Sequence, residues 1–183
     1  MNCALCSKKD CLSGKDCLEN KQEIKNLYQE HEISVIKTAA RIEAEYYMKK
    51  TRIEETILFS MKMNYKKIGL AFCVGLEKES KEIYNIFREY FKVYSACCKI
   101  CGIDKTEFEL EKIDKKREEA MCNPMGQASF FNEKKTDLNI IIGLCIGHDI
   151  LFTEYSNAPV TTLAVKDRIL AHNPLGAIYS NYY

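Results

Sequence analysis

The sequence has no dominant charge, no long apolar run and no start that resembles a signal peptide. Its 27 Lys and Arg residues nearly balance 26 Asp and Glu residues, and a net charge of +1 argues against a nucleic-acid or membrane surface. The strongly apolar stretch over residues 138–148 is about half the ~20 residues that a membrane span needs. The first residues have neither the basic nor the apolar stretch of a secretory signal. We therefore expect a cytoplasmic protein.

Internal repeats and low-complexity tracts are also absent from the 183 residues. Hydrophobic residues make up 46% of the chain and charged residues 29%, which is too apolar for disorder. A chain of this length corresponds to one domain, with at most a small appendage. The unusual feature is the ten cysteines, which in a reducing cytoplasm indicate metal binding or catalysis rather than disulfides.

Four of the cysteines lie near the start of the chain, separated by two, four and five residues: Cys3, Cys6, Cys11 and Cys17. Only Leu5 and Leu12 are larger apolar side chains between Met1 and Cys17, so this segment cannot build a hydrophobic core. Four thiolates at such short spacing predict a tetrahedral metal site. We expect a structural site, because four protein ligands leave no coordination position open.

Soft sulfur ligands favour Zn²⁺ or an iron–sulfur cluster over Mg²⁺ or Ca²⁺. We expect zinc at this site, with an iron–sulfur cluster as the alternative. Four lysines lie close enough in sequence to offset the negative charge of the thiolates: Lys8, Lys9, Lys15 and Lys21. The simpler alternative is that these are free surface cysteines on a frayed terminus.

Apolar periodicity predicts the elements of the rest of the chain. From Glu19 to about residue 65 there is no Gly or Pro, and helical spacing of apolar residues predicts two helices with a break near Lys50–Thr51. Short apolar runs predict buried strands, and amphipathic stretches predict helices between them. The expected strands cover residues 68–74, 93–98, 138–145, 160–165 and 168–170, and the expected helices cover residues 77–91, part of 104–121, 124–132 and a segment from His148.

This alternation predicts a three-layer α/β fold, with a mainly parallel sheet and helices on both faces. The last two strands are expected to pair around Lys166–Asp167. The predicted division is a cysteine-rich metal knuckle over residues 1–18 and an α/β domain with two leading helices over residues 19–183. In an open parallel sheet the carboxyl ends of the strands line the ligand crevice, so we expect a site there.

Cys145 lies between glycines where a predicted strand gives way to a helix. The run Gly143-Leu-Cys145-Ile-Gly147 has the form of a nucleophile elbow, which exposes a side chain at the top of a sheet. The amino terminus of the helix is expected to lower the thiol pKa. His148 and Asp149 follow at once as a base or a ligand. The alternative is that the glycines serve only the backbone.

Other cysteines fall at predicted strand ends, where burial as a small hydrophobe is the simpler explanation. We interpret Cys73 and Cys97 as core residues on this basis. A rival interpretation places four cysteines, with spacings of two, 20 and 22 residues, in a second zinc or cluster site: Cys98, Cys101, Cys122 and Cys145. Near the end of the chain, Lys166–Asp167 is either a polar turn or part of a site, and so is His172, which precedes an Asn-Pro turn signal.

Several sequence blocks resemble the DUF1847 family. They are the cysteine-rich start, Cys122-Asn-Pro-Met-Gly-Gln-Ala128, Gly143-Leu-Cys-Ile-Gly-His-Asp149-Ile-Leu-Phe152, Ala158-Pro-Val-Thr-Thr162 and Lys166-Asp-Arg-Ile-Leu-Ala-His-Asn-Pro174. The family is described as uncharacterised metal-binding proteins of archaea and anaerobic bacteria. The resemblance implies metal binding at the four cysteines of the start, and it implies no reaction. It also implies one shared site formed by Cys122, Cys145, His148, Asp149, Lys166, Asp167, Arg168 and His172.

We therefore expect a pocket at the carboxyl edge of the sheet, lined by Cys122, Cys145, His148, Asp149 and His172. Cys145 is its predicted nucleophile or redox thiol, with His148 as the base. Asp149 or Asp167 is expected to orient an imidazole, and Arg168 to hold an anionic group. The predicted cofactor-binding residues are Cys122, Asp167, Arg168 and His172.

The expected partner of this pocket is an unknown small molecule, and we expect neither a nucleic-acid nor a membrane partner. The alternative function is a non-enzymatic iron–sulfur, metal-sensing or redox-partner module. The tyrosine-rich residues 179–183 are expected to pack either on the domain itself or on a second subunit of a homo-oligomer.

Overall fold

The computed structural model describes residues 2–180 and 182, and it divides the chain into two compact units, residues 1–45 and 46–183. We describe each unit by itself. Among the described residues, no helix is both long and apolar enough to cross a membrane.

The first unit consists of short helices with little buried surface. Its elements are the 3₁₀ turns η1 (Cys3–Leu5) and η2 (Asp10–Ser13), the helix α1 (Lys21–Asn26) and nearly all of α2 (Glu30–Tyr46). No side chain between Asn2 and Arg41 is buried. The four cysteines of the start are all exposed, so the predicted knuckle is not confirmed.

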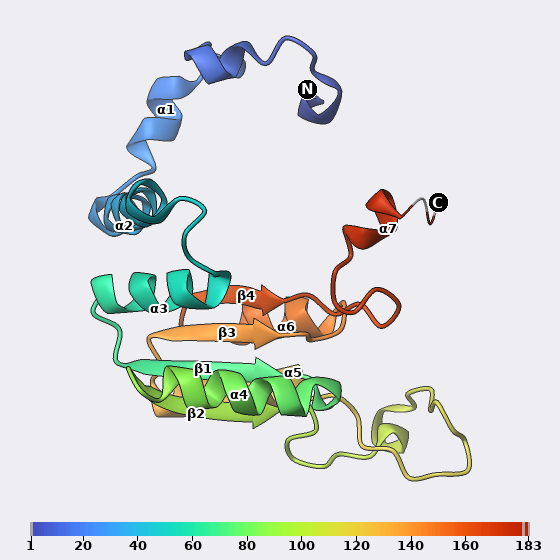
Figure 1. Cartoon of the computed structure of the whole chain (residues 1–183). Helices are drawn as coiled ribbons and strands as arrows, with labels where there is room; N and C mark the ends of the chain where they lie inside the picture. The colour runs from blue at the N-terminus through green and yellow to red at the C-terminus, as the bar shows by residue number, and fades with distance from the viewer. Residues whose placement is uncertain (1, 181, 183) are drawn as a thin grey trace. The chain divides into compact units, whose positions relative to one another are not determined.

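The second unit alternates strands and helices, as the sequence predicts (Figure 1). The sheet has the order β2-β1-β3-β4, and every neighbouring pair is parallel. The elements are α3 (Arg52–Lys62), β1 (Lys67–Phe72), η3 (Val74–Leu76), α4 (Glu77–Phe87), β2 (Lys92–Cys97), η4 (Lys105–Phe108), α5 (Pro124–Lys134), β3 (Leu138–Ile142), α6 (His148–Tyr155), β4 (Val160–Ala164) and α7 (Gly176–Tyr179).

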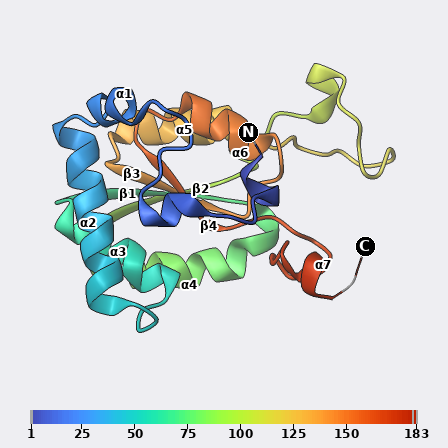
Figure 2. The same ribbon diagram turned by 90° about the horizontal axis from the view of Figure 1, so that it is seen from above.

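Helices cover both faces of this sheet, as Figure 2 shows from above. Because successive side chains of a strand point to opposite faces, β1 contributes Leu70 to one core and Ala71 to the other. Leu70 lies in the core with residues of α3 and α4, among them Phe87. Ala71 lies in the core with Phe131 of α5 and Phe152 of α6. The three-layer α/β fold is thus confirmed.

Two expected elements differ in the structure. Residues 104–121 are helical only in the short 3₁₀ turn η4, and among the described residues no strand follows β4. The side chain of Asp167 explains the second difference, because its Oδ1 accepts hydrogen bonds from the backbone N–H groups of Ile169 (2.9 Å) and Leu170 (2.8 Å). These N–H groups close a turn and are not available to a strand ladder. At the chain end, Tyr179 is exposed, whereas Asn181 and Tyr183 lie outside the described residues.

Candidate functional site

Two buried cysteines follow the neighbouring strands β1 and β2. The parallel register pairs Phe72 with Cys97, which places Cys73 beside Cys98 one residue later. The backbone N–H of Cys98 donates to the carbonyl of Phe72 at 2.8 Å, and the N–H of Val74 donates to Cys98 Sγ at 3.3 Å. Cys73 is 7% exposed and Cys98 is 2% exposed. The expected burial of Cys73 in the core is confirmed. The structure also places Cys73 in hydrogen-bonding contact with the Cys98 thiol.

Cys122 and His148 extend this pair at the starts of α5 and α6, the helices that pack on the same core as Cys73 and Cys98. Cys122 precedes Asn123, whose side chain caps α5 and whose N–H donates to the carbonyl of Cys98 at 2.7 Å. His148 is the first residue of α6. Hydrogen bonds link the side chains in the order Cys73, Cys98, Cys122 and His148. We call these four side chains the thiol row.

Hydrogen bonding divides the sulfurs of the thiol row into two kinds. Cys98 shares its S–H between Cys122 and Cys73, and these contacts together with burial hold its pKa far above the ordinary thiol value. The same S–H, together with His148, lowers the pKa of Cys122 to about 4. The S–H of Cys98, the N–H of Gly75 and the ammonium of Lys166 lower the pKa of Cys73 to about 5. A protonated thiol therefore lies between two thiolates.

His148 is hydrogen-bonded to Cys122 through its side chain. The hydrogen bond to Cys122 raises the pKa of the imidazole above its usual value, against the opposing effect of burial. Both side chains are half-buried, so their attraction is screened less than that of an exposed pair. The hydrogen bond between them favours a thiolate on Cys122 and a proton on His148, the pairing found in proteins that use cysteine as a nucleophile.

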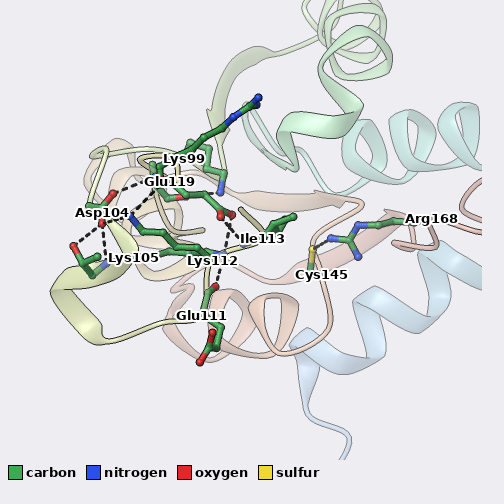
Figure 3. A network of polar contacts seen from close by, with 12 residues as sticks. Lys99, Asp104, Lys105, Glu111, Lys112, Ile113, Glu119, Cys145 and Arg168 are labelled. Carbon is green, nitrogen blue, oxygen red and sulfur yellow. Dashed lines mark hydrogen bonds and ion pairs between the residues drawn. The ribbon is translucent and has the colours of Figure 1, made fainter. Parts of the chain in front are cut away.

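Two lysines place positive charge near the ends of the thiol row. Lys99 lowers the pKa of Cys122 by its charge, and its Nζ donates to the carbonyl of Ala120 at 2.6 Å. Residues 99–121 are held by a network of polar contacts, including the ion pair of Lys105 and Glu119 at 2.8 Å (Figure 3). At the other end, Lys166 lies so close to Gly75 that a Cβ there would be 3.3 Å from Nζ.

Cys145 lies at the same edge but outside the thiol row. Arg168 Nη2 donates to Cys145 Sγ at 3.1 Å (Figure 3). The backbone N–H groups of His148 and Asp149 donate to the Cys145 carbonyl, whereas the His148 side chain bonds to Cys122. The structure thus brings most of the predicted pocket residues to one edge, but it pairs the predicted base with a different thiol.

The glycines on both sides of Cys145 have backbone roles. Gly143 and Gly147 adopt φ values of 64° and 84°, in the left-handed region that favours glycine. A Cβ on Gly143 would also collide with Leu76. The glycines are therefore accounted for by chain geometry, whatever Cys145 does.

The two predicted orienting carboxylates bond to nearby backbone N–H groups and not to an imidazole in the described contacts. Asp149 Oδ1 accepts from the N–H of Ile150 at 2.9 Å, and Asp167 caps the turn after β4. His172 Nδ1 accepts a hydrogen bond from the backbone N–H of Asp167 at 3.2 Å. His172 is thereby held in the turn by the backbone and not by a carboxylate.

The residues that the structure describes include no group of three or more His, Cys, Asp or Glu side chains placed to hold a metal ion. Among the four cysteines of the rival second site, Cys98 and Cys122 are in contact. Cys101 is exposed, and Cys145 lies beside Arg168. In the amino-terminal segment, Cys17 Sγ donates to the carbonyl of Lys15 at 3.9 Å.

Sequence reasoning did not place Cys73 or Lys99 beside Cys122, and it grouped Cys98 with Cys122 only in the rival metal site. The sequence does contain a feature that points to the two cysteines. Cys73 and Cys98 each end an apolar run, and a strand formed by such a run places the sulfur at the carboxyl edge of a parallel sheet. What the runs do not give is the strand order β2-β1-β3, which makes Cys73 and Cys98 direct neighbours.

Comparison with known proteins agrees with the sequence blocks. The family described as "Protein of unknown function (DUF1847)" matches residues 11–163, a range that includes the whole thiol row. A protein of Methanocaldococcus jannaschii described as "Uncharacterized protein MJ0455" is 56% identical over 185 aligned positions, which cover all of this chain and 96% of the relative. No solved structure matches the chain. The chain therefore belongs to the DUF1847 family.

Proposed function

We propose that the protein carries out thiolate chemistry on a small molecule at the carboxyl edge of the sheet, with Cys122 as the reactive sulfur. One observation supports this most directly: the Cys122 sulfur is hydrogen-bonded both to the Cys98 thiol and to the His148 imidazole. A free thiol is mostly protonated at neutral pH, whereas a thiolate beside an imidazolium is ready to attack. The proposal keeps His148 in its expected place and moves the nucleophile from Cys145 to Cys122.

Arg168 gives this site a group for an anionic ligand. Its side chain is exposed, and its guanidinium is already positioned by the contact with Cys145. A guanidinium binds carboxylate or phosphate through two parallel hydrogen bonds. We propose a small anionic molecule as the ligand, and neither nucleic acid nor a membrane as a partner.

Alkylation with iodoacetamide tests the reactive thiol. At about pH 6, where free thiols with a pKa near 8.5 are largely protonated, Cys122 should be labelled at least tenfold faster than N-acetylcysteine in the same tube. Quantitative peptide mass spectrometry measures the labelling of each cysteine. Cys122→Ser should abolish the fast phase, and the exposed-site control Cys101→Ser should retain it. A Cys122 that labels no faster than N-acetylcysteine contradicts the proposal.

A second candidate function is zinc binding by Cys3, Cys6, Cys11 and Cys17. It is favoured by the absence of any buried side chain between Asn2 and Arg41 among the described residues, since such a segment needs another source of order. A tetrathiolate ion supplies that order in small coreless segments. An iron–sulfur cluster on the same ligands is the alternative, as a redox or sensing module. Either form fits a reducing cytoplasm, where we place the protein.

Metal content tests this second function. Protein purified without oxygen should contain one zinc per chain by elemental analysis, and a variant with serine at all four positions should contain none. Cys101→Ser is the matched control and should keep the metal. A brown protein with iron and sulfide reverses the choice of metal, and a wild-type chain without metal contradicts the function.

A further inference from the structure

The thiol row joins an accessible thiolate to a buried thiol. Cys122 is half-buried, whereas Cys98 is 2% exposed. The two sulfurs are hydrogen-bonded, and the backbone holds the two segments together because the Asn123 N–H donates to the Cys98 carbonyl at 2.7 Å. A disulfide needs Cα atoms that lie about 4.4–6.8 Å apart, and this backbone hydrogen bond brings the two chain segments side by side.

We propose that the thiol row reduces small-molecule disulfides by thiol–disulfide exchange, with Cys122 as the attacking thiol and Cys98 as the resolving thiol. This inference rests on the proposed reactivity of Cys122 and adds a substrate class and a second sulfur to it. The two roles require different sulfurs, because the attacking thiolate must reach the substrate and the resolving thiol must stay protonated until the first bond has formed.

The first step forms a mixed disulfide. The Cys122 thiolate attacks one sulfur of the substrate R–S–S–R′, the substrate S–S bond breaks, and R′–S⁻ leaves. The imidazolium of His148 lies beside Cys122 and can give its proton to this leaving group. The sulfur that leaves faster is the one with the lower pKa.

The second step closes a protein disulfide. Cys98 gives its proton to the Cys73 thiolate and attacks Cys122 Sγ, and R–S⁻ leaves as the Cys98–Cys122 bond forms. Two electrons pass from the two protein sulfurs to the substrate, which ends as two thiols. A low-molecular-weight dithiol then returns the protein to its reduced form by the reverse exchange.

In the second step of this reaction, Cys73 acts as the base because of its position next to Cys98. It is hydrogen-bonded to Cys98, so the Cys98 proton has an acceptor in direct contact, and it is itself 7% exposed. Burial keeps Cys73 from competing for the substrate. Cys145 contacts Arg168 and is outside the row, so it has no resolving partner among the described contacts.

The test uses the full reduced chain without oxygen, and oxidised glutathione as the probe. Samples are quenched in acid, blocked with N-ethylmaleimide and mapped by peptide mass spectrometry. The wild type should form a Cys98–Cys122 disulfide and release two glutathione molecules per chain. Cys98→Ser, or Cys98→Ala as a second variant, should stop at glutathione bound to Cys122. Cys73→Ala should slow the second step at least tenfold, and Cys101→Ser should behave as the wild type.

Each result has one meaning. A wild-type chain that keeps glutathione on a reactive Cys122, or that forms a Cys73–Cys98 disulfide, overturns the exchange mechanism but leaves the reactive thiolate in place. A Cys122 that is inert to both iodoacetamide and oxidised glutathione overturns the proposed function as well. Circular dichroism confirms that each variant is folded before it is compared.

Discussion

The pKa of Cys122 is lowered by hydrogen bonds from two side chains of different chemical character. Cys98 donates a neutral S–H from inside the core, and the imidazole of His148 donates from the start of α6. Hydrogen bonds to a charged group contribute about 1.5–3 kcal/mol, roughly twice a neutral bond. The imidazole is therefore the neighbour whose loss should be easiest to detect without disturbing the core.

Replacing His148 by Gln should raise the pKa of Cys122 from about 4 by about one to two units, since one unit corresponds to 1.36 kcal/mol. The thiolate exists above this pKa and is lost as the pH falls through it. The alkylation rate of the variant should therefore decline at a higher pH than that of the wild type. Iodoacetamide rates for Cys122 across the acidic range measure the shift, with Cys98 and Lys99 still present in both proteins.

His172→Gln is the matched control for this experiment. His172 bonds to the backbone of Asp167 and is absent from the contacts that shift Cys122, so its replacement should leave the Cys122 profile unchanged. An equal shift in both variants would mean that histidine charge acts over long range and not through the contact with Cys122.

Among the helices, α3 begins with a capping box that two residues of the local sequence, Thr51 and Glu54, form by themselves. Thr51 accepts a hydrogen bond from the N–H of Glu54, and the Glu54 carboxylate accepts one from the N–H of Thr51 at 2.8 Å. This reciprocal pair satisfies two backbone donors that a helix start leaves open. It lies where the sequence predicts the break between the two leading helices.

Thr51→Ala should lower the free energy of unfolding by about 1 kcal/mol, because the cap oxygen is lost. Thr51→Ser keeps that oxygen and should stay close to the wild type. Urea denaturation followed by circular dichroism measures both. If the alanine and serine variants were equally stable, packing of Ile57 and its neighbours in the core would set the helix start, and the cap would contribute little.

The elements that sequence reasoning found are those with a strong local cause. Four of the five residues of β3 are apolar, which predicts a strand buried on both faces, and all five residues are buried. Asn123 before Pro124 predicts the start of α5. The expected strand over residues 168–170 failed because apolar residues beside Lys166–Asp167 resemble a hairpin, and only the three-dimensional position of the Asp167 carboxylate shows that it takes their N–H groups.

At the scale of the molecule, the site depends on strand order more than on any motif. Sequence reasoning placed Cys122, Cys145 and His148 at the carboxyl edge, because parallel strands end together there. It did not pair Cys122 with His148, since that contact depends on α5 and α6 packing side by side on one face. Nor did it join Cys73 to Cys98, because their strands are separated in sequence by α4 and become neighbours only in the sheet.

The two candidate sites also differ in what metal removal should do to the molecule. If zinc is held by Cys3, Cys6, Cys11 and Cys17, a chelator removes the source of order from a segment in which no described side chain is buried. Hydrogen exchange should then rise at residues 2–20, while the buried strands β1 and β3 keep their protection. Unfolding of the sheet should be unchanged, because none of its core contacts is lost.

Hydrogen exchange resolved by peptide mass spectrometry measures this, with and without chelator. The variant with serine at the four amino-terminal positions should show the raised exchange without any chelator, and a chelator should change it no further. Loss of protection at the ends of β1 and β2 would place the metal at the thiol row instead. In that case Cys73 and Cys98 would be ligands, and their thiols could not act in disulfide exchange while the metal is bound.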